Sequence, residues 1–436
     1  MKADITTLGE RKIVSPLDER YKDRDTVFVE DDEKIISSTS LKKLKSLDNL
    51  EDILCFEKAG PRRKIFFDSS KVKSAIVTCG GLCPGLNDVI RSIVMESYFA
   101  YGAENIIGIK YGYNGLLPNK KIEPIELNPD VVDHIHTLGG TILASSRGGT
   151  DDMETIVDSL ERLNVNILYA IGGDGTQKGA RQIAEIALKR GLKMSVIGIP
   201  KTIDNDLNYI SKSFGFETAF SEAVISIHRA HNEAKGAPNG IGLVKLMGRE
   251  SGFIAASAAL AMSDVNFCLI PEVPFELYGE NGFLAHLEKR IIERKHAVIC
   301  VAEGAGQDLI LEENVKADAS GNKMLKDIGI FLKEKIANHF EERKIEANIK
   351  YIDPSYLIRS APANANDSLF CALLGQFAVH AGMAGKTNMI VGTWNDEFIH
   401  LPIELVTSER NKIDPHSRFW FSVLQSTGQA PHMTNE

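Results

Sequence analysis

The strongest constraint on the fold is an alternation of short apolar runs, glycine-rich loops and helical patterns that begins near Lys73. Its clearest unit starts with the apolar run 167–171 and continues into the loop 172–176. The spacing of the apolar residues that follow predicts a helix that stops at Gly191, and a second strand is expected over 196–199. A strand, a helix and a strand within about 30 residues form a right-handed unit in which both strands are parallel. The sequence therefore predicts an α/β fold.

A similar unit begins with an expected strand at 74–79 and continues through the glycine-rich loop 80–85 into an amphipathic helix. The carboxyl ends of parallel strands lie at one edge of a sheet, where such sheets bind ligands. We therefore expect the loops 80–85, 172–176 and 200–206 to lie at the same edge. Further strands are expected at 106–110, 241–246, 266–270, 297–302 and 389–391, and an amphipathic helix is expected at 325–340.

Length and composition exclude several classes of protein. The 436 residues exceed the ~250–300 that one hydrophobic core accommodates, so two lobes are expected. The longest apolar run, 253–262, is about half of the ~20 residues that a membrane-spanning helix needs, and no apolar leader begins the chain. We expect no membrane association and a cytoplasmic location. The net charge of −9 without a basic stripe argues against nucleic acid as a partner, and six dispersed cysteines indicate reduced thiols.

The first 72 residues differ from the rest, because they are charged and poor in glycine. With few apolar residues to bury, this extension is expected to be a solvated arm rather than part of a catalytic site.

The first motif is Gly172-Gly173-Asp174-Gly175-Thr176, at a predicted strand-to-helix turn. Glycines there let backbone N–H groups approach phosphate oxygens, the helix N-terminus favours negative charge, and a carboxylate can hold Mg²⁺. An ordinary tight turn capped by Asp or Thr has the same residues. The motif alone therefore indicates phosphoryl transfer without naming the acceptor, and nicotinamide-dinucleotide kinases and lipid kinases share it.

The second motif is Pro200-Lys201-Thr202-Ile203-Asp204-Asn205-Asp206. One carboxylate could orient and deprotonate an attacking hydroxyl while the other arranges a metal or the lysine. The alternative is a solvated turn rich in Asx residues. This alternative weakens if the loop emerges beside the first motif.

The third motif is Met247-Gly248-Arg249, which follows an expected strand. A guanidinium between glycines suits an anionic ligand, but a surface arginine on a turn fits equally well. A fourth segment, Gly385-Lys386-Thr387, resembles the end of a P-loop. His380 stands where the first P-loop glycine would be, so we interpret this segment as a helix-to-strand turn.

The three motifs, in this order, resemble the 6-phosphofructokinase family, and the resemblance extends from about Lys73 to Thr393. The long N-terminal extension is similar to that of the longer branch found in protists, plants and some bacteria. The resemblance implies a glycolytic enzyme that transfers the γ-phosphoryl group of MgATP to the 1-hydroxyl of fructose 6-phosphate. It also implies a homodimer or homotetramer of subunits with two Rossmann-like α/β lobes and mainly parallel sheets.

The same resemblance implies a division of the chain and roles for particular residues. The segments are an N-terminal extension (1–72), a nucleotide-binding lobe (73–213), a sugar-phosphate-binding lobe (214–355) and a return segment with the C-terminal tail (356–436). Asp204 would be the proton acceptor, assisted by Arg249 and Lys201, and Asp174 would be the Mg²⁺ ligand. The residues implied for the nucleotide are Gly81, Arg147, Gly148, Gly173, Asp174, Gly175 and Thr176. Those implied for the sugar phosphate are Thr202, Ile203, Asp204, Met247, Gly248, Arg249, Glu303, Lys350, Tyr356 and Arg359, with Lys350 reaching across a subunit interface.

Two positions bear on details of the resemblance. Family members that use pyrophosphate usually have aspartate at the position of Gly175 and lysine at that of Lys201. An aspartate would occupy and repel the α-phosphate of ATP, whereas glycine leaves space, so ATP is the expected donor. A pyrophosphate-dependent enzyme is the alternative, and a non-catalytic regulatory subunit is less favoured because Asp174, Asp204 and Arg249 are all present. Gly240 replaces an arginine of simple bacterial members.

Overall fold

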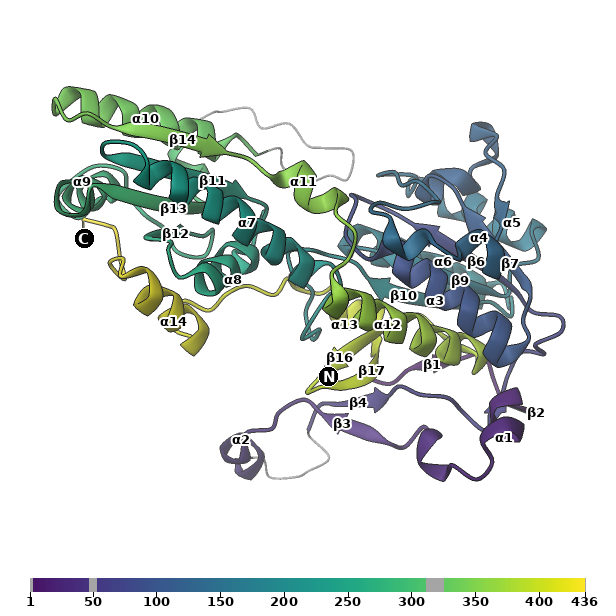
Figure 1. The fold of residues 1–436 in the computed structure, drawn as a ribbon. Coiled ribbons are helices and arrows are strands. Elements are labelled where there is room, and N and C mark those ends of the chain that lie inside the picture. Colours follow the sequence, from purple (N-terminus) through teal and green to yellow (C-terminus); the bar gives the residue numbers. More distant parts are fainter. Residues whose placement is uncertain (1–2, 47–52, 311–324, 436) are drawn as a thin grey trace. The chain divides into compact units, whose positions relative to one another are not determined.

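The computed structural model describes residues 3–46, 53–310 and 325–435. The chain forms two compact units, which are coloured by sequence in Figure 1 and described separately here. The first unit comprises the chain up to Thr202, then Leu207–Gly215 and Ser360–Arg410. The second comprises Ile203–Asp206, Phe216–Arg359 and the chain from Asn411 onward. The chain thus passes between the units several times.

The first unit is built on a large sheet whose centre is parallel. Its neighbouring central strands are ordered β16-β10-β9-β6-β7, and each adjacent pair is parallel. Antiparallel strands flank this centre on both sides. The central strands are β6 (Lys73–Thr78), β7 (Asn105–Ile109), β9 (Ile167–Gly172), β10 (Ser195–Pro200) and β16 (Met389–Trp394). The flanking strands are β3 (Lys34–Ile36), β4 (Cys55–Lys58), β8 (Ile125–Glu126) and β17 (Glu397–Pro402).

The strand order of this sheet reverses between β6 and β9. From β6 the chain proceeds to β7 on one side, whereas from β9 it proceeds to β10 and β16 on the other. Right-handed crossovers in opposite directions place their helices on opposite faces of a sheet. The helices are α3 (Leu86–Met95) after β6 and α6 (Asp174–Lys189) after β9. α3 packs with α12 (Ala365–Met383), and α6 packs with α5 (Met153–Arg162).

Burial explains the composition of these strands. Every residue of β9 and of β10 is buried, as expected of parallel strands that are covered on both faces. Ala75 and Val77 of β6 share a core cluster with Ile183 and Ala184 of α6. The predicted parallel strands of this unit and the predicted α/β class are confirmed.

The second unit contains a smaller sheet in the order β12-β13-β11-β14, in which all neighbours are parallel. One core cluster unites it with α7 and α8, and another unites it with α9 and α10. The predicted helix at 325–340 is confirmed but begins at Ile328, because the Asp327 carboxylate accepts the N–H of Ile330 at 3.0 Å. The strands are β11 (Gly240–Leu246), β12 (Phe267–Leu269), β13 (His296–Ala302) and β14 (Asn348–Ile352). The helices are α7 (Phe216–Lys235), α8 (Phe253–Met262), α9 (Phe283–Arg294), α10 (Ile328–Glu342), α11 (Ser355–Ser360) and α14 (Arg418–Thr427).

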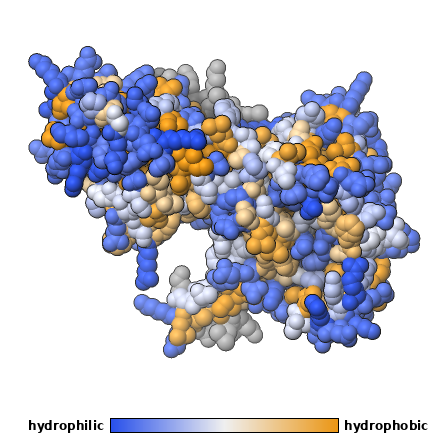
Figure 2. All heavy atoms as spheres, viewed as in Figure 1, coloured by the Kyte–Doolittle hydropathy of each residue, from blue (hydrophilic) through white to orange (hydrophobic). Residues whose placement is uncertain are grey.

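The first unit also contains several short strands and α-helices. They are β1 (Thr6–Thr7), β2 (Ile13–Val14), α1 (Pro16–Tyr21), α2 (Leu41–Lys45), β5 (Lys64–Ile65), α4 (Pro129–Val132), β15 (Lys386–Thr387) and α13 (Ile403–Val406). None of the helices in the described part of the chain combines the length and apolarity that a membrane span requires. Figure 2 shows hydrophilic side chains over most of the visible face, with hydrophobic patches interspersed on each unit.

The expectation of a solvated N-terminal arm is wrong. β4 pairs with β17, and β3 pairs with β4, so the arm extends the large sheet. β1 pairs with β15. Phe56 is completely buried, and its ring lies 5.6 Å from that of Tyr209 and 5.8 Å from that of Trp394. The arm is therefore part of the folded core of the first unit.

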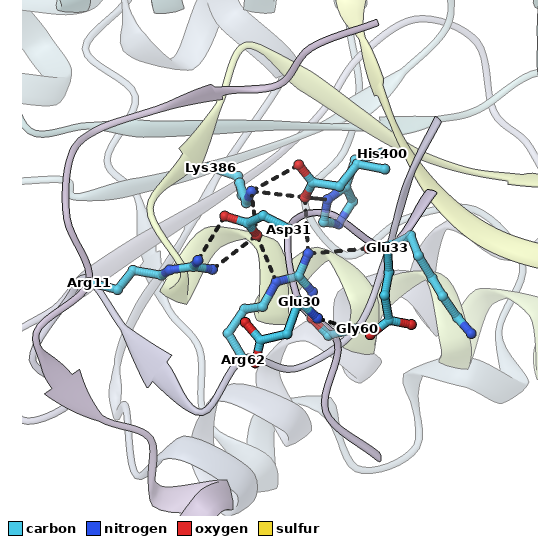
Figure 3. A network of polar contacts seen from close by, with 10 residues as sticks. Arg11, Glu30, Asp31, Glu33, Gly60, Arg62, Lys386 and His400 are labelled. Carbon is cyan, nitrogen blue, oxygen red and sulfur yellow. Dashed lines mark hydrogen bonds and ion pairs between the residues drawn. The ribbon is translucent and has the colours of Figure 1, made fainter. Parts of the chain in front are cut away.

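A largely buried network of polar and charged side chains attaches this arm (Figure 3). The Lys386 ammonium donates to Asp31 at 2.9 Å and to Glu57 at 3.0 Å. Arg62 bonds the same two carboxylates at 3.0 Å each, and His400 Nδ1 lies 2.9 Å from Glu57. Lys386 was expected in a helix-to-strand turn, but it lies in the short strand β15 and is 1% exposed. Lys386 therefore forms ion pairs with Asp31 and Glu57 inside the first unit.

This network makes stability sensitive to pH. Burial opposes the ionisation of Glu57, but the hydrogen bond from His400 and the charge of Lys386 outweigh it, so the pKa of Glu57 lies below its usual value. A carboxyl with a lowered pKa stabilises the folded state above its unfolded pKa of about 4.3. This stabilisation is lost as the pH falls through the folded-state value.

We expect Glu57→Gln to lower the free energy of unfolding by about 3–5 kcal/mol at neutral pH, because two buried cations lose a carboxylate. Urea unfolding followed by tryptophan fluorescence measures this, since Trp394 lies beside Phe56. The difference from wild type should narrow below about pH 4. Glu10→Gln is the control, because its pair with Lys12 is exposed. Equal stability of Glu57→Gln and Glu10→Gln would contradict a stabilising network.

Candidate active site

The first candidate loop lies where β9 ends and α6 begins. α6 starts at Asp174, and Gly173 before it provides no side-chain cap for the first-turn N–H groups. A helix end of this kind attracts anions through its dipole and its N–H groups. The Asp174 carboxylate accepts a hydrogen bond from Lys178 at 2.9 Å, one turn further along the helix. The loop thus combines an anion-binding helix end with a carboxylate.

The glycines of this loop differ in the space around them. A Cβ atom at Gly172 would lie 2.2 Å from Thr176 Oγ1, and one at Gly173 would lie 3.3 Å from the Lys201 carbonyl oxygen. A Cβ at Gly175, in contrast, would meet no atom within 4 Å. The space beside Gly175 is therefore open.

Lys201 connects this loop to the one that follows β6. Its backbone N–H donates to the carbonyl of Gly172 at 3.1 Å, and its ammonium donates to the carbonyl of Gly81 at 2.8 Å. The residue is 7% exposed. The structure thus brings Gly81, Gly173 and Lys201 together at the carboxyl edge of β6, β9 and β10, as the sequence predicted for these loops.

The segment around Arg147 lies at the same edge. The N–H of Gly80 donates to the Ser146 carbonyl at 2.9 Å, and the Ser145 hydroxyl donates to the Gly80 carbonyl at 2.7 Å. Gly148 has a φ of +80°, a conformation that favours glycine. Arg147 is exposed. These bonds hold Arg147 and Gly148 next to the loop that carries Gly81.

Cys79, directly after β6, is a buried thiol. Burial raises the pKa of Cys79 to about 12, although the charge of Lys201 opposes this. Among the described residues no group of three or more His, Cys, Asp or Glu side chains is arranged to hold a metal ion.

In the second unit, Met247–Arg249 and Glu303 follow the neighbouring strands β11 and β13. The N–H of Glu303 donates to the Leu246 carbonyl at 2.8 Å, and the N–H of Gly304 donates to the Gly248 carbonyl at 3.0 Å. Gly248 has a φ of +128°, and a Cβ there would lie 2.5 Å from the carbonyl oxygen of Ser251. Only glycine fits this turn, which fixes where Arg249 leaves the backbone.

Glu303 lies among positive charges. Burial raises the pKa of Glu303, while Arg249, Lys245 and Arg359 favour its ionised form. A carboxyl group near three cations can accept hydrogen bonds from hydroxyl groups while the cations attract a phosphate. This arrangement suits a ligand that carries both kinds of group.

The loop 200–206 is divided between the units. Lys201 and Thr202 belong to the first unit, whereas Ile203–Asp206 belongs to the second. The Ser251 hydroxyl donates to the Asp204 carbonyl oxygen at 3.1 Å, which places this part of the loop beside the turn of Arg249. The second unit therefore brings Ile203, Asp204 and the Met247–Arg249 turn together.

Helix α11 carries two further predicted residues. Tyr356 is 80% exposed, and the guanidinium of Arg359 lies 4.9 Å from the centre of its ring. Lys350 lies on β14 and is exposed.

At Gly240, the first residue of β11, a Cβ would lie 2.0 Å from the Ala234 carbonyl oxygen. The arginine of simple bacterial family members therefore has no room at this position.

Two buried or half-buried residues near these loops escaped the sequence analysis. Gln177 donates hydrogen bonds to three backbone carbonyls at the ends of β9 and β10. Lys245 pairs with Asp327 and Asp353 at 2.8 Å each, and Asp353 accepts the N–H of Ser355 at the start of α11. A polar residue at a buried position of a helix or strand was the available signal in both cases.

Comparisons with known proteins agree with the fold and the motifs. Residues 73–382 match the phosphofructokinase family. An ATP-dependent 6-phosphofructokinase of Borreliella burgdorferi is 54% identical over 99% of this chain and 97% of its own length. One of Amycolatopsis methanolica is 45% identical over 98% of this chain and 94% of its own length. One of Trypanosoma brucei brucei is 47% identical over 87% of this chain and 77% of its own length.

Two solved structures share the fold at low sequence identity. A pyrophosphate-dependent phosphofructokinase from Marinobacter aquaeolei has a TM-score of 0.67 at 19% identity, covering 82% of this chain and 91% of its own. A Pichia pastoris phosphofructokinase has a TM-score of 0.64 at 19% identity, covering 82% of this chain and 37% of its own. With a family match over most of its length and close relatives that span nearly all of it, this chain belongs to the phosphofructokinase family.

Proposed function

We propose that this chain transfers the γ-phosphoryl group of ATP to the 1-hydroxyl of fructose 6-phosphate, giving fructose 1,6-bisphosphate and ADP. The observation that carries the proposal is that each unit has one set of strand ends suited to one of the two substrates. One set offers an anion-binding helix end, and the other offers Glu303 among cations. The names of the relatives at 54% and 45% identity support both ATP as the donor and this acceptor.

The first unit is proposed to hold the nucleotide. Its phosphates would lie against the N–H groups of Gly173–Thr176, with Gly81 and the segment Arg147–Gly148 next to them. Three observations support this: α6 begins without a side-chain cap, Arg147 is exposed, and the space beside Gly175 is open. The open space accommodates the α-phosphate that pyrophosphate lacks, so ATP is favoured over pyrophosphate as the donor.

Asp174 is proposed to hold Mg²⁺ on these phosphates. In such sites the protein usually contributes one or two carboxylates, and substrate phosphates and waters supply the other ligands of Mg²⁺. The side chain of Asp174 is 23% exposed at the start of α6, which fits such a shared site. When bound, Mg²⁺ would neutralise charge on the phosphates.

The second unit is proposed to hold fructose 6-phosphate. Glu303 and the backbone of Met247–Arg249 would contact the sugar, and Tyr356 and Arg359 would contact the 6-phosphate. The exposed ring of Tyr356 and the cations that surround Glu303 support these roles. Lys350 is proposed to contact a sugar phosphate held by another copy of the chain in a homodimer or homotetramer.

Asp204 is proposed to be the base. Its carboxylate would accept the proton of the 1-hydroxyl as the hydroxyl oxygen bonds to the γ-phosphorus and the bond from that phosphorus to ADP breaks. Positioning matters more than basicity in such a transfer, so an ordinary carboxylate suffices. Lys201 and Arg249 would stabilise the charge on the transferred group, and Thr202 and Ile203 would contact the sugar phosphate.

The choice of donor can be tested with a coupled assay of initial rates. We expect wild-type turnover with MgATP and little with pyrophosphate. Gly175→Asp should lower kcat/KM for ATP by about 100-fold, because the carboxylate occupies and repels the α-phosphate region. Gly175→Ala is the control, since a Cβ there meets no neighbour, and it should change this value by less than about threefold. Unchanged ATP kinetics in Gly175→Asp, or faster wild-type turnover with pyrophosphate, would overturn the proposed donor.

The assignment of the sugar phosphate to the second unit can be tested at Glu303. Glu303→Gln should raise KM for fructose 6-phosphate by about tenfold, because the neutral amide is a weaker hydrogen-bond acceptor. KM for ATP should stay within about twofold. Glu342→Gln, at the end of α10, serves as a control for charge removal within the same unit. A variant in which KM for ATP rises and that for fructose 6-phosphate does not would refute the assignment.

A further inference from the structure

Gln177 occupies a buried position in the first turns of α6, directly behind the loop Gly172–Thr176. Its side chain is 0% exposed. The side-chain amide nitrogen donates to the carbonyls of Gly172 at 2.9 Å, Ile199 at 3.1 Å and Ala170 at 3.2 Å. Two of these carbonyls belong to β9 and the third to β10. One side chain thus bridges the carboxyl ends of two neighbouring strands.

The orientation of this amide is determined by its surroundings. Three carbonyl oxygens surround the nitrogen, and the reverse orientation would place an oxygen against all three. The other end of the amide lies close to β10, where a Cβ at Gly198 would be only 2.1 Å from Gln177 Oε1. Within the described residues, this Oε1 atom is buried and has no hydrogen-bond partner. The fold therefore leaves one buried polar atom unsatisfied so that the N–H groups can reach the two strands.

The bridged strand ends carry the residues proposed to act on the nucleotide. The Gly172 carbonyl accepts from Gln177 and also from the backbone N–H of Lys201. Gly172 precedes Gly173 and Asp174, and Ile199 lies two residues before Lys201. A change in the spacing between β9 and β10 would therefore move the phosphate loop relative to the Lys201 ammonium.

We propose that Gln177 is a positioning residue for phosphoryl transfer, which fixes the spacing between the Gly172–Asp174 loop and Lys201 through its three backbone hydrogen bonds. The inference rests on the proposed function of this edge of the sheet. Gln177 does not contact the substrates. It acts through the backbone at the ends of β9 and β10.

The first test uses Gln177→Met, which keeps the length of the side chain but removes both N–H groups. We expect kcat per folded molecule to fall by about 10–100-fold, since a displacement of about 1 Å can cost 100-fold. KM for fructose 6-phosphate should stay within about twofold. Ile183→Ala is the matched control, because Ile183 is buried on the same helix and belongs to the apolar core cluster. Its kcat per folded molecule should match that of wild type.

Gln177→Glu provides a pH signature. An ionised carboxylate against three carbonyl oxygens is unfavourable, and a protonated one can donate a single hydrogen bond. The ratio of the activity of Gln177→Glu to that of wild type, each per folded molecule and at the same pH, should rise as the pH is lowered from about 8.5 to about 6.5. A ratio that is flat across this range would contradict the role of the N–H groups.

Hydrogen exchange gives a readout that does not depend on turnover. The Lys201 N–H donates to the Gly172 carbonyl, so we expect it to exchange at least about tenfold faster in Gln177→Met than in wild type. If wild type lacks turnover, the proposed function fails while this measurement still tests the bridge. Unchanged exchange at Lys201 would overturn the inference. So would a kcat per folded molecule that is equal in Gln177→Met and wild type, or equally reduced in Ile183→Ala.

Discussion

Parallel pairing of β9 with β6 and β10 is the interaction on which the first unit depends. It brings the loops after three strands to one edge, and the reversal of strand order between β6 and β9 leaves that edge uncovered by crossover helices. The helix end of α6, the loop of Gly81 and the buried ammonium of Lys201 meet there as a result. The second unit repeats the principle, because β11 and β13 are parallel neighbours and present Arg249 and Glu303 side by side.

In each unit a polar side chain with little exposure forms several hydrogen bonds or ion pairs near these strand ends. Gln177 bridges β9 and β10, and Lys245 of β11 pairs with Asp327 and Asp353 at the starts of α10 and α11. Groups of this kind are costly to bury unless they are hydrogen-bonded, and their contacts have directional requirements that apolar packing lacks. The same reasoning applies to the network around Lys386, which joins the N-terminal arm to β17 and β15. Buried hydrogen bonds thus fix the N-terminal arm in one place and the carboxyl ends of β9 and β10 in the other.

The sequence predicted the α/β class, the parallel strands other than β14 and the edge at which the loops gather, because apolar periodicity and glycine position are local signals. It did not predict the place of the arm, since the charged residues Glu57 and Arg62 were expected in a solvated arm and Lys386 in a helix-to-strand turn. The partners of Lys386, Asp31 and Glu57, lie 355 and 329 residues from it in the chain, and no local pattern reveals such pairs. Gln177 and Lys245 were missed although each is a polar residue at a position of a helix or strand with little exposure. Gly175, in contrast, was singled out from the sequence, and the structure shows open space beside it.

The most direct test of the account is a comparison of binding and turnover in Asp204→Ser. If Asp204 accepts the proton of the 1-hydroxyl, kcat should fall by about 10²–10⁴-fold. Calorimetric dissociation constants for fructose 6-phosphate and for MgATP should stay within about threefold of wild type. Asp308→Ser, at an exposed position of the same unit, controls for loss of a carboxylate. Turnover near that of wild type in Asp204→Ser would contradict the account, because the proposed transfer step would then proceed without its base.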